Sequence, residues 1–285
     1  MRKLIIIGAI LVMLVVLLFA SGAGLYFMFW ADKIVYEVKE GIKTAGVKHK
    51  SKENLKPIVR EYVRESYSLL GVPLPRRYVL LKSIAKFGKP GVDILIEILK
   101  DKEEGKNKVK MVYGGEADKS MRIAAVYIIS EISEAGKKGH KDFKKAYEAI
   151  RKKIPTLVKI LLHDKDVEVR IKTAETLGDI GDEQAVDGLI KALDDPGEFD
   201  VGQVEPDTVR ESAAFSLGEI KTLRAVVPLI KTLERERERI LVVSNIAIAL
   251  EEIGDRSAVA PLIHALEKKM AEGTIIESIG KLGGG

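Results

Sequence analysis

Apolar and polar residues alternate with a helical period over much of the chain, and the pattern repeats. The clearest copies, which align with one another without a gap, are residues 176–193, 216–233 and 249–266. In the first helix of one copy the apolar residues Val169, Ala174, Leu177 and Ile180 recur at helical spacing. The second half of each copy has one apolar stripe of its own. The pattern therefore predicts pairs of helices joined by short turns, which bury their apolar faces by stacking.

The predicted turn contains glycine and acidic residues, which raises the question of a ligand site. Gly181 and Asp182 stand where the first helix must end. Gly254 and Asp255 take the same place in a later copy, and a lysine and a threonine replace them in the copy between. Glycine suits a left-handed helix C-cap, and aspartate caps the helix that follows. A cation or phosphate site is the alternative, but the substitution and the lack of a following Gly-Lys-Ser/Thr favour a structural turn.

Fainter copies extend the array toward the N-terminus. They are residues 84–99, residues 127–133 with 154–162, and a partial unit at 278–285. We therefore predict an all-α solenoid of stacked helix pairs over residues 76–285. Insertions interrupt it at residues 101–120, 133–153 and 195–207. Insertions in solenoids map to loops, where specificity often lies.

The insertion 195–207 is acidic and has one large apolar residue, Phe199. We expect this side chain at the tip of a loop, with Glu198 and Asp200 beside it. Together with Tyr113, in the insertion 101–120, these residues are our candidates for contact with a partner. The alternative is an ordinary exposed aromatic residue, which is common on protein surfaces.

A row of arginines occupies one position of the repeat. It consists of Arg77, Arg122, Arg170 and Arg210, and Val243 replaces the arginine in the fifth unit. The acids that precede three of them by three or four residues are Asp118, Asp166 and Asp207. An arginine row suits phosphate or carboxylate recognition, but acids so close would neutralise it. We therefore favour a structural ladder of Asp–Arg pairs that caps helices and joins adjacent repeats.

These segments resemble the HEAT repeats of the phycobilin lyase-like group. The shared pattern is L-G-x-I-G-D-x-x-A-V-x-x-L-I, and Asp207 with Val209-Arg210 and Asp166 with Val169-Arg170 are further local matches. The resemblance covers about five units and a partial one, from residue 77 to the end. It implies a HEAT-like solenoid, and for function it implies a scaffold, a chromophore-lyase subunit or a partner-binding module. The insertions and Val243 depart from the pattern.

The N-terminal segment has a different character, because residues 4–30 are 27 residues without a charge. About 20 apolar residues suffice to cross a bilayer as a helix. Aromatic residues gather at the far end of the run, as they do at a membrane interface. We therefore expect residues 1–30 to form a transmembrane anchor, followed by a juxtamembrane helical segment at 31–75. A cleaved signal peptide is the alternative, because small residues lie near Ala20.

The orientation of this expected anchor depends on the flanking cations. Arg2 and Lys3 favour a cytoplasmic N-terminus, and the lysines from Lys33 onward favour the opposite. We expect the first arrangement, in which the protein is a single-pass membrane protein and its solenoid is extracytoplasmic.

The charges divide the rest of the chain into two parts. Residues 31–163 contain 30 Lys and Arg against 17 Asp and Glu, whereas residues 164–285 contain 15 against 25. We therefore expect a basic partner at the distal, acidic end. Nucleic-acid binding by the basic portion 76–163 is the alternative. The favoured explanation of its lysines is a solvated loop, or a surface close to the expected anchor that is attracted to lipid phosphates.

Little in the sequence indicates catalysis. The chain has no cysteine, and its four histidines include no His-Glu dipeptide, which a HEAT-like di-iron hydroxylase would require. It also lacks a Gly-x-Ser-x-Gly nucleophile motif. We therefore predict no catalytic residue, metal or cofactor, and a scaffold that binds a protein partner. A lyase-like enzyme subunit is the alternative.

The partial unit at 278–285 is expected to leave an apolar face, which a partner or a second copy of the chain would cover by self-association.

Overall fold

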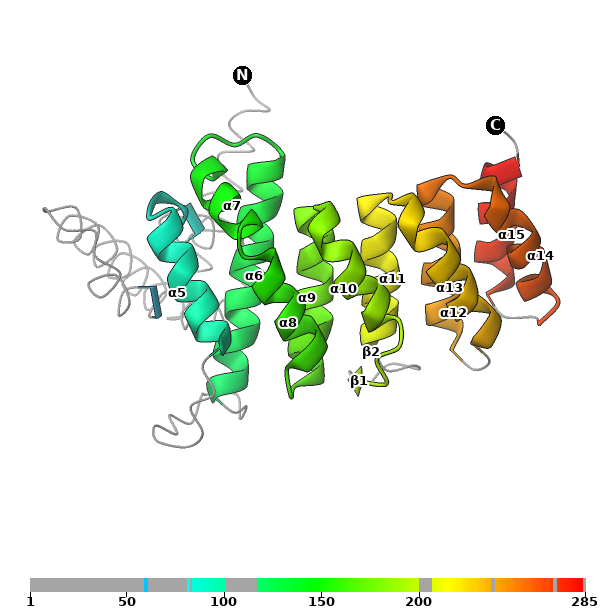
Figure 1. Ribbon diagram of the computed structural model, residues 1–285, viewed down its shortest axis with the longest axis horizontal. Helices are drawn as coiled ribbons and strands as arrows, with labels where there is room; N and C mark the ends of the chain where they lie inside the picture. The colour runs from blue at the N-terminus through cyan, green and yellow to red at the C-terminus, as the bar shows by residue number, and fades with distance from the viewer. Residues whose placement is uncertain are drawn as a thin grey trace, which may run out of the picture.

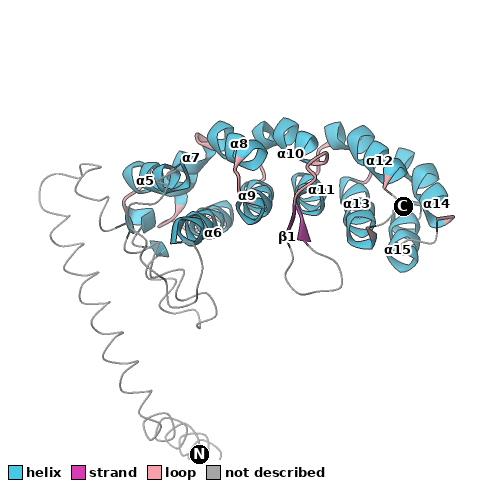
Figure 2. Ribbon diagram, turned by 90° about the horizontal axis from the view of Figure 1, so that it is seen from below, coloured by secondary structure: helices cyan, strands magenta, loops and turns pink. Residues whose placement is uncertain are grey.

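The computed structural model describes residues 59–60, 81–82, 84–100, 117–199, 207–236, 239–268 and 271–283. These residues form two layers of helices stacked along one curved axis (Figures 1 and 2). The predicted all-α solenoid of helix pairs is confirmed for the part of the chain that the structure describes. A pair of two-residue strands is its one non-helical element there.

The layer on the concave side, called the inner layer here, contains the first helix of each repeat (Figure 2). Its helices are α6 (Ala117–Lys137), α9 (Val167–Ile180), α11 (Val209–Ile220), α13 (Ile240–Ile253) and α15 (Glu272–Gly283). The helices of the outer layer are α5 (Lys89–Lys100), α7 (Lys144–Arg151), α8 (Ile154–His163), α10 (Val186–Ala192), α12 (Val226–Arg235) and α14 (Val259–Leu266). Single turns of 3₁₀ helix, η1 (Glu183–Ala185), η2 (Leu223–Ala225) and η3 (Arg256–Ala258), lead into the last three outer helices.

The turns between the layers have the structural role that the sequence predicts. Gly181 and Gly254 end α9 and α13 in the left-handed conformation, with φ of 68° and 79°. Lys221 adopts the same conformation at the end of α11, with φ of 57°. The Asp182 side chain accepts a hydrogen bond from the Gln184 backbone N–H at 3.0 Å, and Asp255 does so from Ser257 at 2.8 Å. The two Gly-Asp turns therefore cap the helix that follows with their own side chains, as structural turns do.

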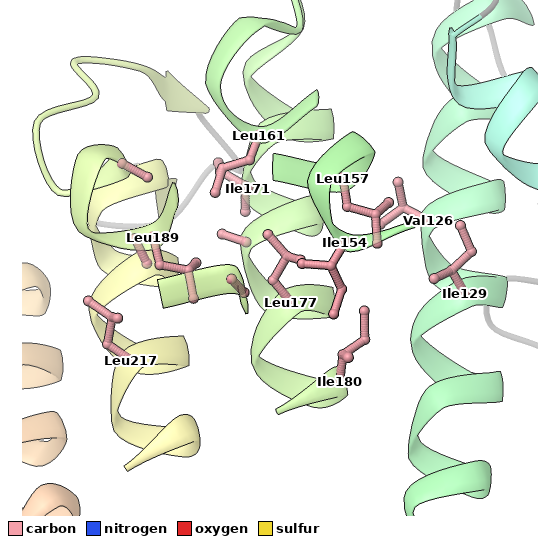
Figure 3. Packing of buried hydrophobic residues seen from close by; sticks show 14 of the residues in the cluster. Val126, Ile129, Ile154, Leu157, Leu161, Ile171, Leu177, Ile180, Leu189 and Leu217 are labelled. Carbon is pink, nitrogen blue, oxygen red and sulfur yellow. The ribbon is translucent and has the colours of Figure 1, made fainter. Parts of the chain in front are cut away.

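The hydrophobic core lies between the two layers and runs through successive repeats. Figure 3 shows Leu157 and Leu161 of α8 and Leu189 of α10 facing Ile171 and Leu177 of α9. All five side chains are at most 1% exposed. Because neighbouring repeats share these contacts, no helix pair buries its apolar face alone.

Inner helices approach one another closely where small residues face each other. A Cβ atom at Gly218 of α11 would lie 2.8 Å from the Cα atom of Ala249 on α13. At Gly178 of α9 it would lie 2.7 Å from the Ser216 hydroxyl oxygen, which donates a hydrogen bond to the Ala174 carbonyl at 2.8 Å. Glycine at both positions therefore sets the spacing of the inner layer.

Each of the three insertions contains regular structure in its described residues, and α6 begins at Ala117 within the insertion 101–120. The insertion expected as a loop at 133–153 instead prolongs α6 to Lys137 and adds α7, so this expectation is corrected. Within the insertion 195–207, β1 (Glu198–Phe199) pairs antiparallel with β2 (Asp207–Thr208), and Glu198 lies opposite Thr208. Residues 101–116 lie outside the described residues.

The expected membrane localisation is corrected by the structure. Among the residues that the structure describes, no helix combines the length and the apolar character that crossing a membrane requires. The longest of them, α6 with 21 residues, carries charges along its length. Residues 1–58, which include the apolar run 4–30, lie outside the described residues. The expected single-pass, extracytoplasmic arrangement is therefore withdrawn.

Candidate interaction surface

The inner layer leaves one face of its helices open to solvent. Each inner helix lies between its neighbours in the layer and below the outer layer (Figure 2). The exposed residues of such a helix therefore form a stripe on the remaining side, which faces the concave side of the stack. On α11 this stripe includes Phe215 and Glu219, and on α13 it includes Ile248 and Glu252. We call the surface formed by these stripes on α6, α9, α11 and α13 the concave face.

An apolar row crosses the concave face. Phe215 is 46% exposed and Ile248 is 38% exposed, and they occupy the same position in consecutive repeats. Among the large hydrophobic residues that are exposed in the described ranges, Phe215 is the one aromatic residue. Tyr127, half-buried, takes the same place on α6, and Glu175 takes it on α9. An exposed aromatic side chain at a position that can also be glutamate has no packing role, so it is a candidate contact for a partner.

Polar contacts fix the side chains around this row. The Lys172 ammonium lies 5.7 Å from the centre of the Tyr127 ring and 2.9 Å from the Glu175 carboxylate. The Ser212 hydroxyl donates to the same carboxylate at 3.4 Å. Partial burial on its own would lower the pKa of Lys172, but the Glu175 carboxylate outweighs it and raises the pKa above its ordinary value. Lys172 is therefore a charged, positioned group on the face.

An acidic row runs beside the apolar row. Its members are Asp179, Glu219 and Glu252. They follow Glu175, Phe215 and Ile248 by four positions, which is about one helical turn. Glu219 and Glu252 are exposed. The Ser130 hydroxyl donates to Asp179 at 2.5 Å, and Lys221 lies 2.5 Å from Glu252. The hydrogen bond between Lys221 and Glu252 raises the pKa of Lys221 above its ordinary value.

The arginine row lies at one edge of the stack, and its partners differ from the predicted ones. Arg122, 4% exposed, donates to both carboxylate oxygens of Asp164, which follows α8. Arg170 binds Asp195, which follows α10, through two hydrogen bonds of 2.9 Å. In the next repeat Arg210 binds Glu236 after α12 at 3.1 Å. Each arginine therefore joins the first helix of its repeat to the end of the second helix.

The acids that the sequence singled out have other positions. Asp166 caps α9 by accepting from the Glu168 backbone N–H at 3.2 Å, and it lies 4.0 Å from Arg122 of the preceding repeat. Asp207 stands in β2 opposite Phe199. Arg77 and the Asp118 side chain lie outside the described residues. Short spacing along one helix identified the arginines, but it could not reveal partners that follow about 25 to 40 residues later.

The expected aromatic loop tip is also corrected. Phe199 is half-buried against the core, and the Lys119 ammonium covers its ring at 4.6 Å from the centre. The reason is the pairing of β1 with β2, which holds this residue against the solenoid. Glu198 is exposed and forms an ion pair with Arg239. Asp200 and Tyr113 lie outside the described residues, so their proposed contacts stay predictions.

The described residues show no group of three or more histidine, aspartate or glutamate side chains placed to hold a metal ion.

The exposed residues that matter most for contact, Phe215 and Ile248, were not singled out from the sequence. A signal for them exists, because the aligned repeats place a large apolar residue where α9 has Glu175.

Comparison with known proteins agrees with this architecture. Residues 114–204 match HEAT repeats, and residues 209–235 and 242–268 match the PBS lyase HEAT-like repeat. A comparison with curated proteins gives no match.

Comparison with solved structures gives matches at low identity and low TM-score. They include the complex of CpcE and CpcF of phycocyanin lyase from Nostoc sp. PCC7120, at 19% identity over 78% of this chain and 94% of that chain, with a TM-score of 0.39. A designed armadillo repeat protein is 20% identical over 79% of this chain and 99% of its own, with a TM-score of 0.42. Human deoxyhypusine hydroxylase in complex with glycerol is 14% identical over 91% of this chain and 98% of its own, with a TM-score of 0.37.

The two family models together account for more than half of the chain. Their repeats coincide with the helix pairs of the structure, from α6 to α14. The chain therefore belongs to the HEAT-repeat proteins, and its C-terminal repeats are of the PBS lyase-like type.

Proposed function

We propose that this protein is an interaction scaffold that binds another protein on its concave face. The observation that carries the proposal is the apolar row, in which Phe215 and Ile248 are exposed on consecutive inner helices. In protein interfaces a few residues near the centre carry most of the binding energy, and buried aromatic anchors are prominent among them. The proposal assigns no catalytic residue.

The surroundings of the row support this role. Ala213 and Ala214 are fully buried on α11, and Gly218 meets Ala249 at the α13 contact, so the helices under the row are closely packed. A face held in this way loses little conformational freedom on binding, which favours affinity. Repeated helices also offer a surface long enough for an extended partner.

The test replaces Phe215 with a photo-crosslinking amino acid in the full-length chain. The matched control places the same group at Val227, which is 59% exposed on outer helix α12. We expect a discrete cross-linked protein from position 215 and none from position 227. With that protein purified, Phe215→Ala should weaken its binding by at least about tenfold, as loss of an aromatic anchor does, and Val227→Ala should leave it unchanged. Equal cross-linking at both positions would overturn the proposal.

A lyase-like enzyme subunit is the second candidate, favoured by the match of residues 209–235 and 242–268 to PBS lyase HEAT-like repeats. This role requires the chain to bind a chromophore or a partner subunit that does. Titration of the full-length chain with a bilin, followed by its absorbance, tests it. A saturable spectral shift supports the second candidate, and an unchanged spectrum removes chromophore binding by this chain alone.

The self-association expected at the C-terminal end stays a prediction. On α15, Ile276 is 58% exposed and Ile279 is half-buried.

A further inference from the structure

We infer that the partner segment bound on the concave face is cationic: a stretch of polypeptide that carries Lys and Arg side chains together with at least one large apolar side chain. The inference rests on the proposed function, because it names the chemistry of the partner for the same surface. It is argued from the distribution of charge between the two layers.

The inner layer is acidic and the outer layer is not. The inner helices α9, α11, α13 and α15 contain nine Asp and Glu against four Lys and Arg. The outer helices α8, α10, α12 and α14 contain two against four. The sequence alone indicated an acidic half of the chain, whereas the structure shows that, among the helices of that half, the excess of acidic residues lies in the inner layer. A cationic partner is therefore attracted to the concave side specifically.

The cations of the inner layer do little to offset this charge at the apolar row. Arg170 and Arg210 lie at the edge of the stack and are bound to Asp195 and Glu236. Lys281 lies 2.8 Å from Glu251 and 2.9 Å from Glu277, which raise its pKa. These three side chains are therefore committed to acids of their own.

The remaining cation, Lys172, lies at the α6 end of the row and is held by Glu175. The exposed carboxylate of Glu219 follows Phe215 by one helical turn, and Glu252, which forms an exposed ion pair with Lys221 at the end of α11, follows Ile248 in the same way. Apolar and acidic groups therefore stand side by side on two consecutive helices.

This arrangement suits a segment that lies across the inner helices. Neighbouring packed helices are about 8–10 Å apart, which an extended chain spans in about three residues. Such a segment would place apolar side chains on Phe215 and Ile248 and cationic side chains beside Glu219 and Glu252. A guanidinium or ammonium group can also stack on the Phe215 ring, which adds to the attraction. An anionic partner such as nucleic acid would meet like charge on this face.

The experiment measures binding of a labelled synthetic peptide to the full-length chain by fluorescence anisotropy. The peptide has about 12 residues, enough to cross three to four inner helices, and contains alternating Lys or Arg with two Leu residues. Its matched control has Glu in place of every cation. We expect saturable binding of the cationic peptide that weakens several-fold as salt rises from about 50 to 300 mM, and no binding of the acidic peptide.

Two charge-reversal variants locate the binding. Glu219→Lys changes the concave face, and Glu234→Lys makes the same change at an exposed position of outer helix α12. We expect Glu219→Lys to weaken cationic-peptide binding about tenfold and Glu234→Lys to change it less than twofold. Circular dichroism of both variants establishes that they remain folded. Equal effects of the two variants, binding of the acidic peptide, or no binding of the cationic peptide up to about 1 mM would overturn the inference.

The outcome is separable from that of the proposed function. If Phe215→Ala impairs binding of the cross-linked protein while Glu219→Lys does not, the concave face is an interaction site and its partner is not cationic. If neither substitution has an effect, both conclusions are wrong.

Discussion

The middle repeats and the last repeat share one pattern of apolar residues but differ in the polar contacts that join their helices. In the repeat of α9 and α10, Arg170 connects the two layers through Asp195, with both side chains largely buried. In the repeat of α13 and α14, Val243 occupies the arginine position and is 2% exposed. The common pattern therefore specifies the fold of a repeat, and we expect the stability of a repeat to depend on its polar contacts.

The turn of the middle repeat also has more polar contacts than the turn of the last repeat. In the middle of the stack Asp182 is 8% exposed and binds both the Gln184 backbone and Arg151. In the last repeat Asp255 caps η3 through Ser257 and is more exposed. The partner Arg151 comes from α7, and the described residues show no equivalent arginine bound to Asp255. We therefore expect equivalent substitutions to have larger effects in the middle repeats than in the last one.

The largest effect is expected from Arg170→Val, which gives the middle repeat the residue of the last one. The substitution removes both hydrogen bonds to Asp195 and a third of 2.9 Å to the Asp164 carbonyl. Loss of one partner from a buried pair leaves the other charge uncompensated and costs about 3–5 kcal/mol in the free energy of unfolding. Urea denaturation followed by circular dichroism measures the change.

The control for this prediction is Arg224→Val, because Arg224 pairs with Asp187 and both side chains are mainly exposed. An exposed pair contributes about 0–1 kcal/mol, so this variant should stay close to the parent protein. The double variant Arg170→Val with Asp195→Asn should recover part of the loss, since it removes the orphaned charge. Equal losses for Arg170→Val and Arg224→Val would show that the arginine row does not grade stability.

A smaller effect is expected where the helices of the inner layer touch. Gly218 and Gly280 occupy the same position of the repeat, but a Cβ atom at Gly218 would lie 2.8 Å from the Ala249 backbone, and one at Gly280 would meet nothing within 4 Å. Gly218→Ala should therefore destabilise the protein by about 1–3 kcal/mol through overpacking. Gly280→Ala should stabilise it by up to about 1 kcal/mol, because alanine is the better helix former.

Midpoints of thermal and urea unfolding for both glycine variants give this comparison directly. If Gly218→Ala were neutral, the inner layer would be able to shift by a few tenths of an ångström at no cost. The claim that close packing of the inner helices holds the interaction surface in place would then be wrong.

Most of the fold could be predicted from the sequence because its determinants are local. The helical period of apolar residues identifies the helices, and a glycine that favours the left-handed conformation, followed by a capping aspartate, identifies the turns at Gly181 and Gly254. Even Lys221, which breaks the glycine pattern, adopts the expected conformation with φ of 57°. The partners of the arginines were not predictable in this way, because Asp164, Asp195 and Glu236 become neighbours only when the second helix folds back.

The interaction surface was harder to predict for a related reason. The helical period of apolar residues does not say which of them point away from both neighbouring helices, so the sequence analysis did not single out Phe215 and Ile248. Phe199 was assigned to an exposed tip, and only the pairing of Phe199 with Asp207 explains why it lies against the core. The acidity of the inner layer was likewise hidden, since counting along the chain averages over both layers.

The smallest effect concerns Asp182, and it depends on pH. Burial on its own would raise the pKa of this carboxyl, but hydrogen bonds from the Gln184 backbone and Arg151 hold it below its ordinary value of 3.8. Because the folded pKa is the lower one, the carboxylate contributes its full stabilisation above pH 3.8 and loses it as the pH falls through the folded value. Asp182→Asn should therefore cost about 1 kcal/mol at neutral pH, the typical cost of a lost cap, and progressively less in acid.

Asp255→Asn in the last repeat is the matched variant. The Ser257 backbone lowers the pKa of Asp255 in the same way, but no arginine contributes there, so its loss at neutral pH should be the smaller of the two. Urea unfolding of both variants and the parent protein, at neutral pH and well below pH 3.8, separates the contributions. A loss for Asp182→Asn that persists unchanged in acid would mean that the amide disrupts packing, and that the charge of Asp182 is not what distinguishes the middle turn from the last one.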